Sequence, residues 1–117
     1  MRRFMVAPFV ALSAVLMSCG GSAQTSTVQA PMMESVQKMG GALMVAWMNM
    51  DAGCSAIEGE RKDGAGAFVL SFSLPGDAES KHDTAASGDM TYVYRLRCKK
   101  GNSYSPYSDE MGMNPAR

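Results

Sequence analysis

An eight-residue run near the carboxyl end of the sequence alternates strictly between two kinds of position. In Thr91–Cys98, the even-numbered positions from 92 to 98 carry Tyr, Tyr, Leu and Cys, and Val93, Arg95 and Arg97 lie between them. A period of two residues places successive side chains on opposite faces of a β-strand. The run is rich in aromatic and β-branched residues and contains neither glycine nor proline. We therefore predict a central strand with one buried face and one solvated face.

Turn signals divide the chain after residue 30 into further short segments, none of which keeps a helical period. The expected strands cover residues 31–39, 42–50, 55–62, 67–74, 79–86, 91–98 and 108–113. Trp47, the only tryptophan, lies in phase with Leu43 and Val45, so we expect it in the core and not at a ligand. About seven short strands with closely spaced turns predict an all-β sandwich. No internal repeat is visible, which argues against a propeller or a solenoid.

The first 18 residues have the features of an export signal. Arg2 and Arg3 precede an apolar run, residues 4–17, that is shorter than the roughly 20 residues of a membrane-spanning helix. The next motif, Leu16–Cys19, resembles the lipobox of bacterial lipoproteins. That resemblance implies cleavage before Cys19 and acylation of its thiol, and several acyl chains hold a protein firmly to a bilayer. The alternative is an ordinary secretory signal that ends near a cysteine.

A small, polar segment follows the predicted lipidation site. We interpret residues 19–30 as the lipidated cysteine and a flexible tether, because the segment has almost nothing to bury. Gly20, the residue after the cysteine, is not an acidic residue of the kind that retains lipoproteins at an inner membrane. We therefore expect a lipid-anchored protein of the bacterial cell envelope, at the outer membrane where the cell has two.

The order of motifs in residues 31–115 resembles that of a fibronectin type III domain. The residues that carry the resemblance are Pro31, Val45–Trp47, Ala56–Arg61, His82–Thr84, Thr91–Arg97 and Ser105–Asp109. Within them, Tyr92 stands in the position of the family's corner tyrosine. Gly59 and Ala86 depart from the pattern, because bulkier residues are usual at both positions. The resemblance implies a seven-stranded immunoglobulin-like sandwich that binds or spaces other molecules, and it carries no catalytic residues.

The same resemblance implies a partner for each of the two remaining cysteines. In that fold the third and sixth strands are antiparallel neighbours, which brings Cys54 at the start of one close to Cys98 at the end of the other. We expect a Cys54–Cys98 disulfide, which an exported compartment permits; the alternative is two buried free thiols. The pairing also places two glutamates, Glu58 and Glu60, beside two arginines of the sixth strand. Ion pairs across the strands are then expected, with an anionic-ligand site as the alternative.

Composition argues against several classes of function. Beyond Cys19 the chain has 9 basic and 11 acidic side chains, because two of its 11 basic residues precede that position. A net charge of about −2 gives no basic face for nucleic acid. His82 is the only histidine, and the sequence shows no nucleophile paired with it, no clustered carboxylates and no phosphate-binding loop. We therefore expect neither an enzyme nor a cofactor, and we interpret His82 as a solvated strand or loop residue.

The function expected from these features is non-enzymatic binding of a protein or an envelope polymer by a membrane-anchored module. One alternative is soft-metal binding, because the thioether pairs Met48-x-Met50 and Met111-x-Met113 are of the kind that holds Cu(I). Methionine is also an adaptable filler of cores and surfaces. Another alternative is contact with glycan or peptidoglycan through Tyr104 and Tyr107, since exposed tyrosines stack on sugars. Tyr107 has the competing interpretation of a cover for one end of the sandwich.

Overall fold

The computed structural model describes residues 28–117, in which all regular structure is β-strand. The predicted signal peptide, the lipidation site Cys19 and most of the tether lie outside this range. The strands are β1 (Met32–Met39), β2 (Ala42–Met48), β3 (Ala56–Asp63), β4 (Phe68–Pro75), β5 (Ser80–Asp83), β6 (Tyr92–Lys100), β7 (Ser103–Tyr104) and β8 (Met111–Met113). Within residues 28–117, no helix is long and apolar enough to cross a membrane.

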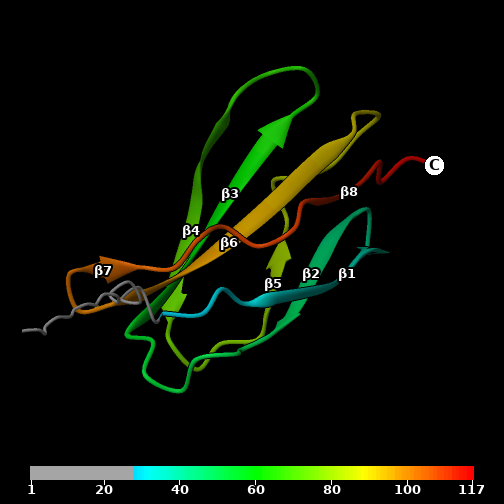
Figure 1. Cartoon of the computed structure of the whole chain (residues 1–117). Helices are drawn as coiled ribbons and strands as arrows, with labels where there is room; N and C mark the ends of the chain where they lie inside the picture. Colours follow the sequence, from blue (N-terminus) through cyan, green and yellow to red (C-terminus); the bar gives the residue numbers. More distant parts are fainter. Residues whose placement is uncertain (1–27) are drawn as a thin grey trace, which may run out of the picture.

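The strands form two antiparallel sheets that pack face to face (Figure 1). The smaller sheet has the order β1-β2-β5. In the larger sheet the order is β4-β3-β6, and β7 and β8 both pair with β6. The predicted all-β, immunoglobulin-like sandwich is therefore confirmed, with eight strands instead of about seven.

Strand β6 is the central strand that its alternation predicts. Tyr92, Tyr94, Leu96 and Cys98 are all buried, and the residues between them are half-buried on the outer face. From Tyr92 to Lys99, β6 pairs with β3, with Asp63 opposite Tyr92 and Ala56 opposite Lys99. This pairing places the largest apolar side chains of the larger sheet against those of the smaller sheet.

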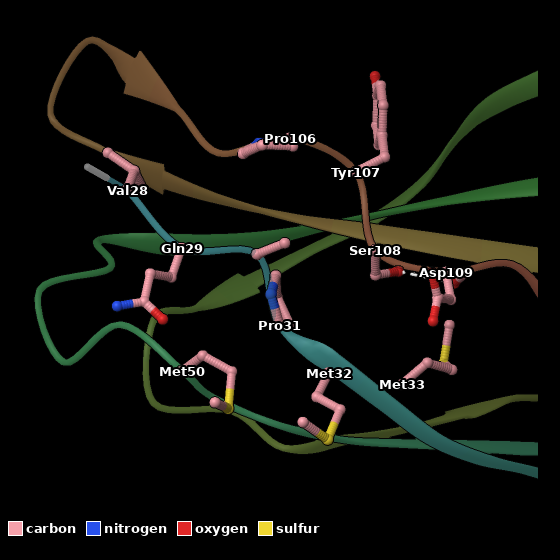
Figure 2. Close-up of a pocket in the computed structure, with 11 residues that line it drawn as sticks. Val28, Gln29, Pro31, Met32, Met33, Met50, Pro106, Tyr107, Ser108 and Asp109 are labelled. Carbon is pink, nitrogen blue, oxygen red and sulfur yellow. Dashed lines mark hydrogen bonds between the residues drawn. The ribbon is translucent and has the colours of Figure 1, made fainter. Parts of the chain in front are cut away.

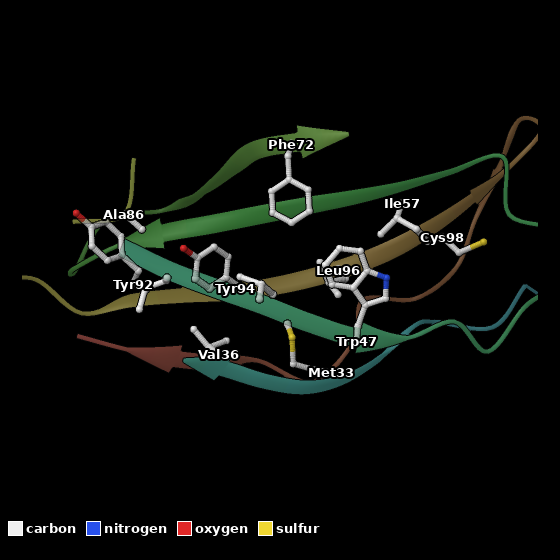
Figure 3. Packing of buried hydrophobic residues seen from close by; sticks show 12 residues of the cluster. Met33, Val36, Trp47, Ile57, Phe72, Ala86, Tyr92, Tyr94, Leu96 and Cys98 are labelled. Atoms are coloured by element: carbon white, nitrogen blue, oxygen red, sulfur yellow. The ribbon is translucent and has the colours of Figure 1, made fainter. Parts of the chain in front are cut away.

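Trp47 of β2 lies in the core, as predicted, with 1% of its surface exposed (Figure 3). Its ring stacks on Phe72 of β4 with the centroids 6.0 Å apart, and its indole N–H donates to the carbonyl of Ala78 at 2.8 Å. Gly59, where the family usually has a bulkier residue, lies directly against the Phe72 ring. A Cβ atom at Gly59 would collide with the Phe72 ring, so this glycine provides the space that the ring fills.

Both ends of β6 are tied to neighbouring segments. At the start, the Tyr92 hydroxyl donates to the Ser87 carbonyl at 2.8 Å, which is the tyrosine corner that the resemblance implies. At the other end, Cys98 is bonded to Cys54, so the expected disulfide is confirmed. The bond joins positions 44 residues apart, and closing a loop of this size stabilises a fold by about 4 kcal/mol in the chain-entropy model.

The last predicted strand, residues 108–113, is wrong in its bounds. Only Met111–Met113 is a strand, and a separate short strand, β7, precedes it. Pro106 has no N–H to donate, so the intervening chain cannot continue the backbone ladder. Two serines take over part of that role: Ser105 and Ser108 each donate a backbone N–H to β6 and accept a β6 N–H on the side-chain oxygen, at 2.7–2.9 Å. This edge of the larger sheet is thereby hydrogen-bonded even where it is irregular.

Candidate binding site

The opposite edge of the larger sheet is formed by β4, which pairs with β3 on one side and with no strand of residues 28–117 on the other. Every second residue of such a strand directs its backbone N–H and C=O groups away from the sheet. The sequence of β4, FVLSFSLP, carries no charge. Val69 and Leu70 are 59% and 58% exposed, which are the largest values among the exposed large hydrophobic residues. An uncharged edge strand of this length with apolar side chains in solvent is a surface for pairing with another strand.

A β-bulge in β4 explains why Leu70 is exposed. Gly59 pairs with Phe72 but the next residue of β3, Glu60, pairs with Leu70, so Ser71 is an extra residue in β4. A bulge of one residue reverses the faces on which the following side chains lie. Phe72 therefore points into the core, whereas Leu70 lies opposite Glu60 on the outer face.

A groove of about 400 Å³ opens beside this edge, between β4 of one sheet and β5 of the other. The residues that line it are Arg61, Val69, Leu70, Ser71, Lys81, Asp83, Thr84 and Ala85. Lys81 makes no ion pair with any of the described residues. The groove therefore combines apolar side chains, open backbone groups and an uncompensated positive charge.

A charged network forms the floor of the groove. Asp83 is 5% exposed. It accepts hydrogen bonds from Arg61 at 2.9 Å and from the buried Tyr94 hydroxyl at 2.8 Å. Burial raises the pKa of Asp83, but the hydrogen bonds from Arg61 and Tyr94 outweigh it, so the pKa of this carboxyl is lowered. Burial, together with the neighbouring carboxylate, raises the pKa of Tyr94. The network holds an ionised aspartate inside the sandwich, which fixes β5 against β3 and β6.

The outer face of the larger sheet carries a ladder of alternating aromatic rings and guanidinium groups. Arg95 lies over Phe68 at 4.2 Å and over Tyr107 at 3.8 Å. Arg97 lies over Tyr104 at 3.8 Å and over Tyr107 at 5.2 Å. The two tyrosines that sequence analysis singled out are thus brought together by one pair of arginines. They are 41% and 37% exposed, for Tyr104 and Tyr107 respectively.

The predicted ion pairs across β3 and β6 are confirmed. Glu60 accepts from Arg95 at 2.7 Å and Glu58 accepts from Arg97 at 2.9 Å. The Tyr107 hydroxyl also donates to Glu60, at 3.0 Å. Burial and this hydrogen bond raise the pKa of Tyr107. The pKa of Glu60 is lowered, because the hydrogen bonds from Arg95 and Tyr107 outweigh the opposing effect of burial. Since the arginines and glutamates of the ladder are paired with one another, their charged groups are not free to bind a ligand.

A second groove, of about 440 Å³, lies beside the start of β1 (Figure 2). The thioethers of Met32 and Met50 lie on one side of it and Pro106 and Ser108 on the other, and the Tyr107 ring points away from it. The first described residues, from Val28, form part of its wall, so the groove adjoins the predicted tether. Its lining is mainly apolar and holds no side chain of basic character.

The methionine pairs named as candidate copper ligands lie in different environments. Met48 and Met50 are exposed. Met111 and Met113 are half-buried and pack against the core. His82 is an exposed residue of β5, as expected for a solvated strand position. Within residues 28–117, no group of three His, Cys, Asp or Glu side chains is placed to hold a metal ion.

No family model and no curated protein sequence matches this chain. Among solved structures, the sixth fibronectin type III domain of human fibronectin type III domain containing protein 3 superimposes with a TM-score of 0.60 and 17% identity, covering 81% of this chain and 89% of that domain. The fold is that of a fibronectin type III domain. A structure described as a myokine matches with a TM-score of 0.59 and 14% identity, over 75% of this chain and 97% of its own length.

An enzyme also contains this fold. A β-1,2-glucanase from Parabacteroides distasonis matches with a TM-score of 0.68 and 10% identity over 76% of this chain. The present chain spans only 13% of that glucanase. At these identities the comparisons show a shared fibronectin type III fold, and a shared fold does not transfer an activity.

Sequence analysis missed the β4 edge as a candidate site. The strand itself was expected at residues 67–74, but its position at an edge depends on the order of strands in space. The absence of charge from Phe68 to Leu74 is visible in the sequence, but an uncharged run is also typical of a central strand, so it does not identify an edge. The bulge that exposes Leu70 has no signal in the sequence either.

Replacing Asp83 by asparagine is expected to lower stability in a pH-dependent way. The pKa of Asp83 is lowered in the folded protein, against about 3.9 in an unfolded chain. Its contribution is therefore complete above that unfolded value and is lost as the pH falls through the folded pKa. At pH 7 we expect Asp83→Asn to cost about 1.5–3 kcal/mol, the range for hydrogen bonds to charged groups.

Urea unfolding between pH 7 and pH 3 measures this difference. The two proteins should converge as the pH falls, because the wild type loses the ionised carboxylate that the variant lacks throughout. Asp77→Asn, at an exposed aspartate, is the matched control and should follow the wild type. A constant difference between Asp83→Asn and wild type across this range would contradict the network described above.

Proposed function

We propose that this protein is a non-enzymatic, lipid-anchored module of the bacterial envelope that binds an extended segment of another protein along β4. The observation that carries the proposal is the uncharged, exposed β4 edge with Val69 and Leu70 in solvent. Strand addition uses main-chain hydrogen bonds for affinity and side-chain contacts for specificity. Both components are available at this edge.

Within the larger sheet, the β4 edge is better suited to bind a ligand than the opposite edge or the outer face. The opposite edge is already hydrogen-bonded by β7, β8 and the serines between them. On the outer face, the rings of Tyr104 and Tyr107 are stacked on guanidinium groups. A glycan would have to compete with those stacking contacts, whereas a strand added at β4 would displace no strand of residues 28–117.

The chemistry of the groove defines the kind of segment that fits. An added strand would place apolar side chains beside Val69 on one face of the sheet and beside Leu70 on the other. A carboxylate on the same segment would compensate Lys81, whose charge has no ion-pair partner among the described residues. We therefore propose an extended, apolar segment with at least one acidic residue as the ligand.

The membrane anchor is the second part of the proposal and rests on the sequence before Val28. An acylated Cys19 and a tether to residue 30 would present the sandwich close to a bilayer, within reach of other envelope proteins. Attachment raises the local concentration of a weak binding edge near its partner.

Photo-crosslinking in intact cells tests the β4 surface. A photoreactive residue at Val69 in the full-length chain should give a product with another protein, because this side chain would lie next to those of the added strand. The product should disappear when Leu70→Lys is present, since a charge at the edge opposes pairing. A probe at Met90, which is exposed but lies in a loop, is the control and should give none.

Two results would overturn the surface assignment. One is equal crosslinking from positions 69 and 90. The other is a product at position 69 whose mass is that of two copies of this chain, which would make β4 a self-association edge instead of a partner site.

Cell fractionation tests the anchor. Cys19→Ala removes the thiol that would carry the lipid, so the variant should move from the membrane fraction to the soluble fraction while the wild type stays with the membrane. Retention of the variant with membranes would show that attachment does not depend on an acyl group at this residue. Cys54→Ala with Cys98→Ala is the control, because these cysteines form the internal disulfide and should leave the membrane attachment intact.

A further inference from the structure

The outer face of the smaller sheet is unusually rich in methionine. The chain has 12 methionines. The strand pairing places Met32 opposite Met48 at one end of this face, and Met39 and Met44 near the other end. Met39 is 46% exposed and Met44 is half-buried. These positions come from two strands and form no motif in the sequence.

The only histidine of the chain lies on the same face, in register with Met44. His82 of β5 is directly opposite Met44 of β2, and side chains at directly opposed positions have Cβ atoms about 4.5–5.5 Å apart. Its ring extends across β2, because Nε2 lies 3.2 Å from the backbone carbonyl of Met39 on β1. One imidazole thus lies beside two methionine residues from two neighbouring strands.

The hydrogen bond to Met39 also determines which ring nitrogen is free. A carbonyl oxygen only accepts, so Nε2 must carry the hydrogen in this contact. In the neutral ring the lone pair is then on Nδ1. Metal-binding histidines typically have this arrangement, in which one nitrogen donates to a backbone carbonyl and the other binds the ion.

We propose that Met39, Met44 and His82 form a binding site for a soft monovalent cation, Cu(I) or its analogue Ag(I). The two thioether sulfurs and Nδ1 would be the ligands. Thioethers select Cu(I) over hard cations and imidazole also binds copper, so this set discriminates against Mg²⁺ and Ca²⁺. The site is independent of the proposed binding edge, because β4 belongs to the other sheet.

The site differs from the methionine pairs that are adjacent in sequence. Met111 and Met113 are packed against the core, so their thioethers serve the apolar interior. Met32 and Met48 are exposed on the same face as the proposed site, but no residue of β5 pairs with Met48. They provide a matched control of equal chemistry without the imidazole.

A competition titration tests the site. Full-length protein carrying Cys19→Ala is used so that no free thiol competes, because the other two cysteines are in the disulfide. Cu(I) is supplied as its complex with a chromogenic chelator, under ascorbate. We expect one Cu(I) per chain, and at least about a tenfold loss of affinity in His82→Ala and in Met44→Leu, the loss expected when a ligand or its support is removed. Met48→Leu should bind as the parent does.

Nitrogen-15 NMR of the histidine ring with Ag(I) gives an independent readout. Binding should shift the Nδ1 resonance of His82 while Nε2 keeps its hydrogen, and a merely structural change would not produce this pattern. Unchanged near-ultraviolet circular dichroism of Trp47 verifies that each variant is folded. Absence of binding at one equivalent, or loss of affinity in Met48→Leu but not in Met44→Leu, would overturn the proposal.

Discussion

The antiparallel pairing of β3 with β6 is the interaction on which the rest of the structure depends. Its register places Glu58 opposite Arg97 and Glu60 opposite Arg95, so each of these four charges has a partner. On the inner face the same register brings the apolar row of β6 beneath Trp47 of the smaller sheet. The disulfide between Cys54 and Cys98 ties one end of the pair. A shift of one residue in this pairing would move every side chain of one strand to the opposite face of the sheet. The ion pairs, the apolar core and the disulfide are therefore compatible with the same single register.

The two sides of this central pair differ in how completely they are hydrogen-bonded. Beyond β6, the short strands β7 and β8 and the serine side chains satisfy the edge despite Pro106. Beyond β3, the bulged strand β4 leaves its outer backbone groups and Leu70 in solvent. In the smaller sheet, the register that aligns β5 with β2 places His82 beside the methionines. The proposed binding edge and the proposed metal site therefore follow from which strands have neighbours, and neither is a contiguous motif.

The sequence allowed the central strand, the sandwich, the buried Trp47 and the disulfide to be predicted, because period-two patterns and a family resemblance report local structure and strand order. The ion pairs followed from the same strand order. The split of the last strand depends on serine side chains that replace backbone acceptors, which a pattern of apolar residues does not show. The exposure of Leu70 depends on a one-residue bulge. The approach of His82 to Met39 joins positions 43 residues apart, and only the pairing of strands in space reveals it.

Amide hydrogen exchange measures the central claim most directly, since it reports the free energy of opening at each backbone N–H. The account predicts that the amides of β6 and β3 exchange only through global unfolding. Alternate amides of β4, which point away from β3, should exchange at rates close to those of an exposed loop. Protection of all β4 amides equal to that of β6, in the protein without a partner, would contradict the description of a closed central pair with one open edge.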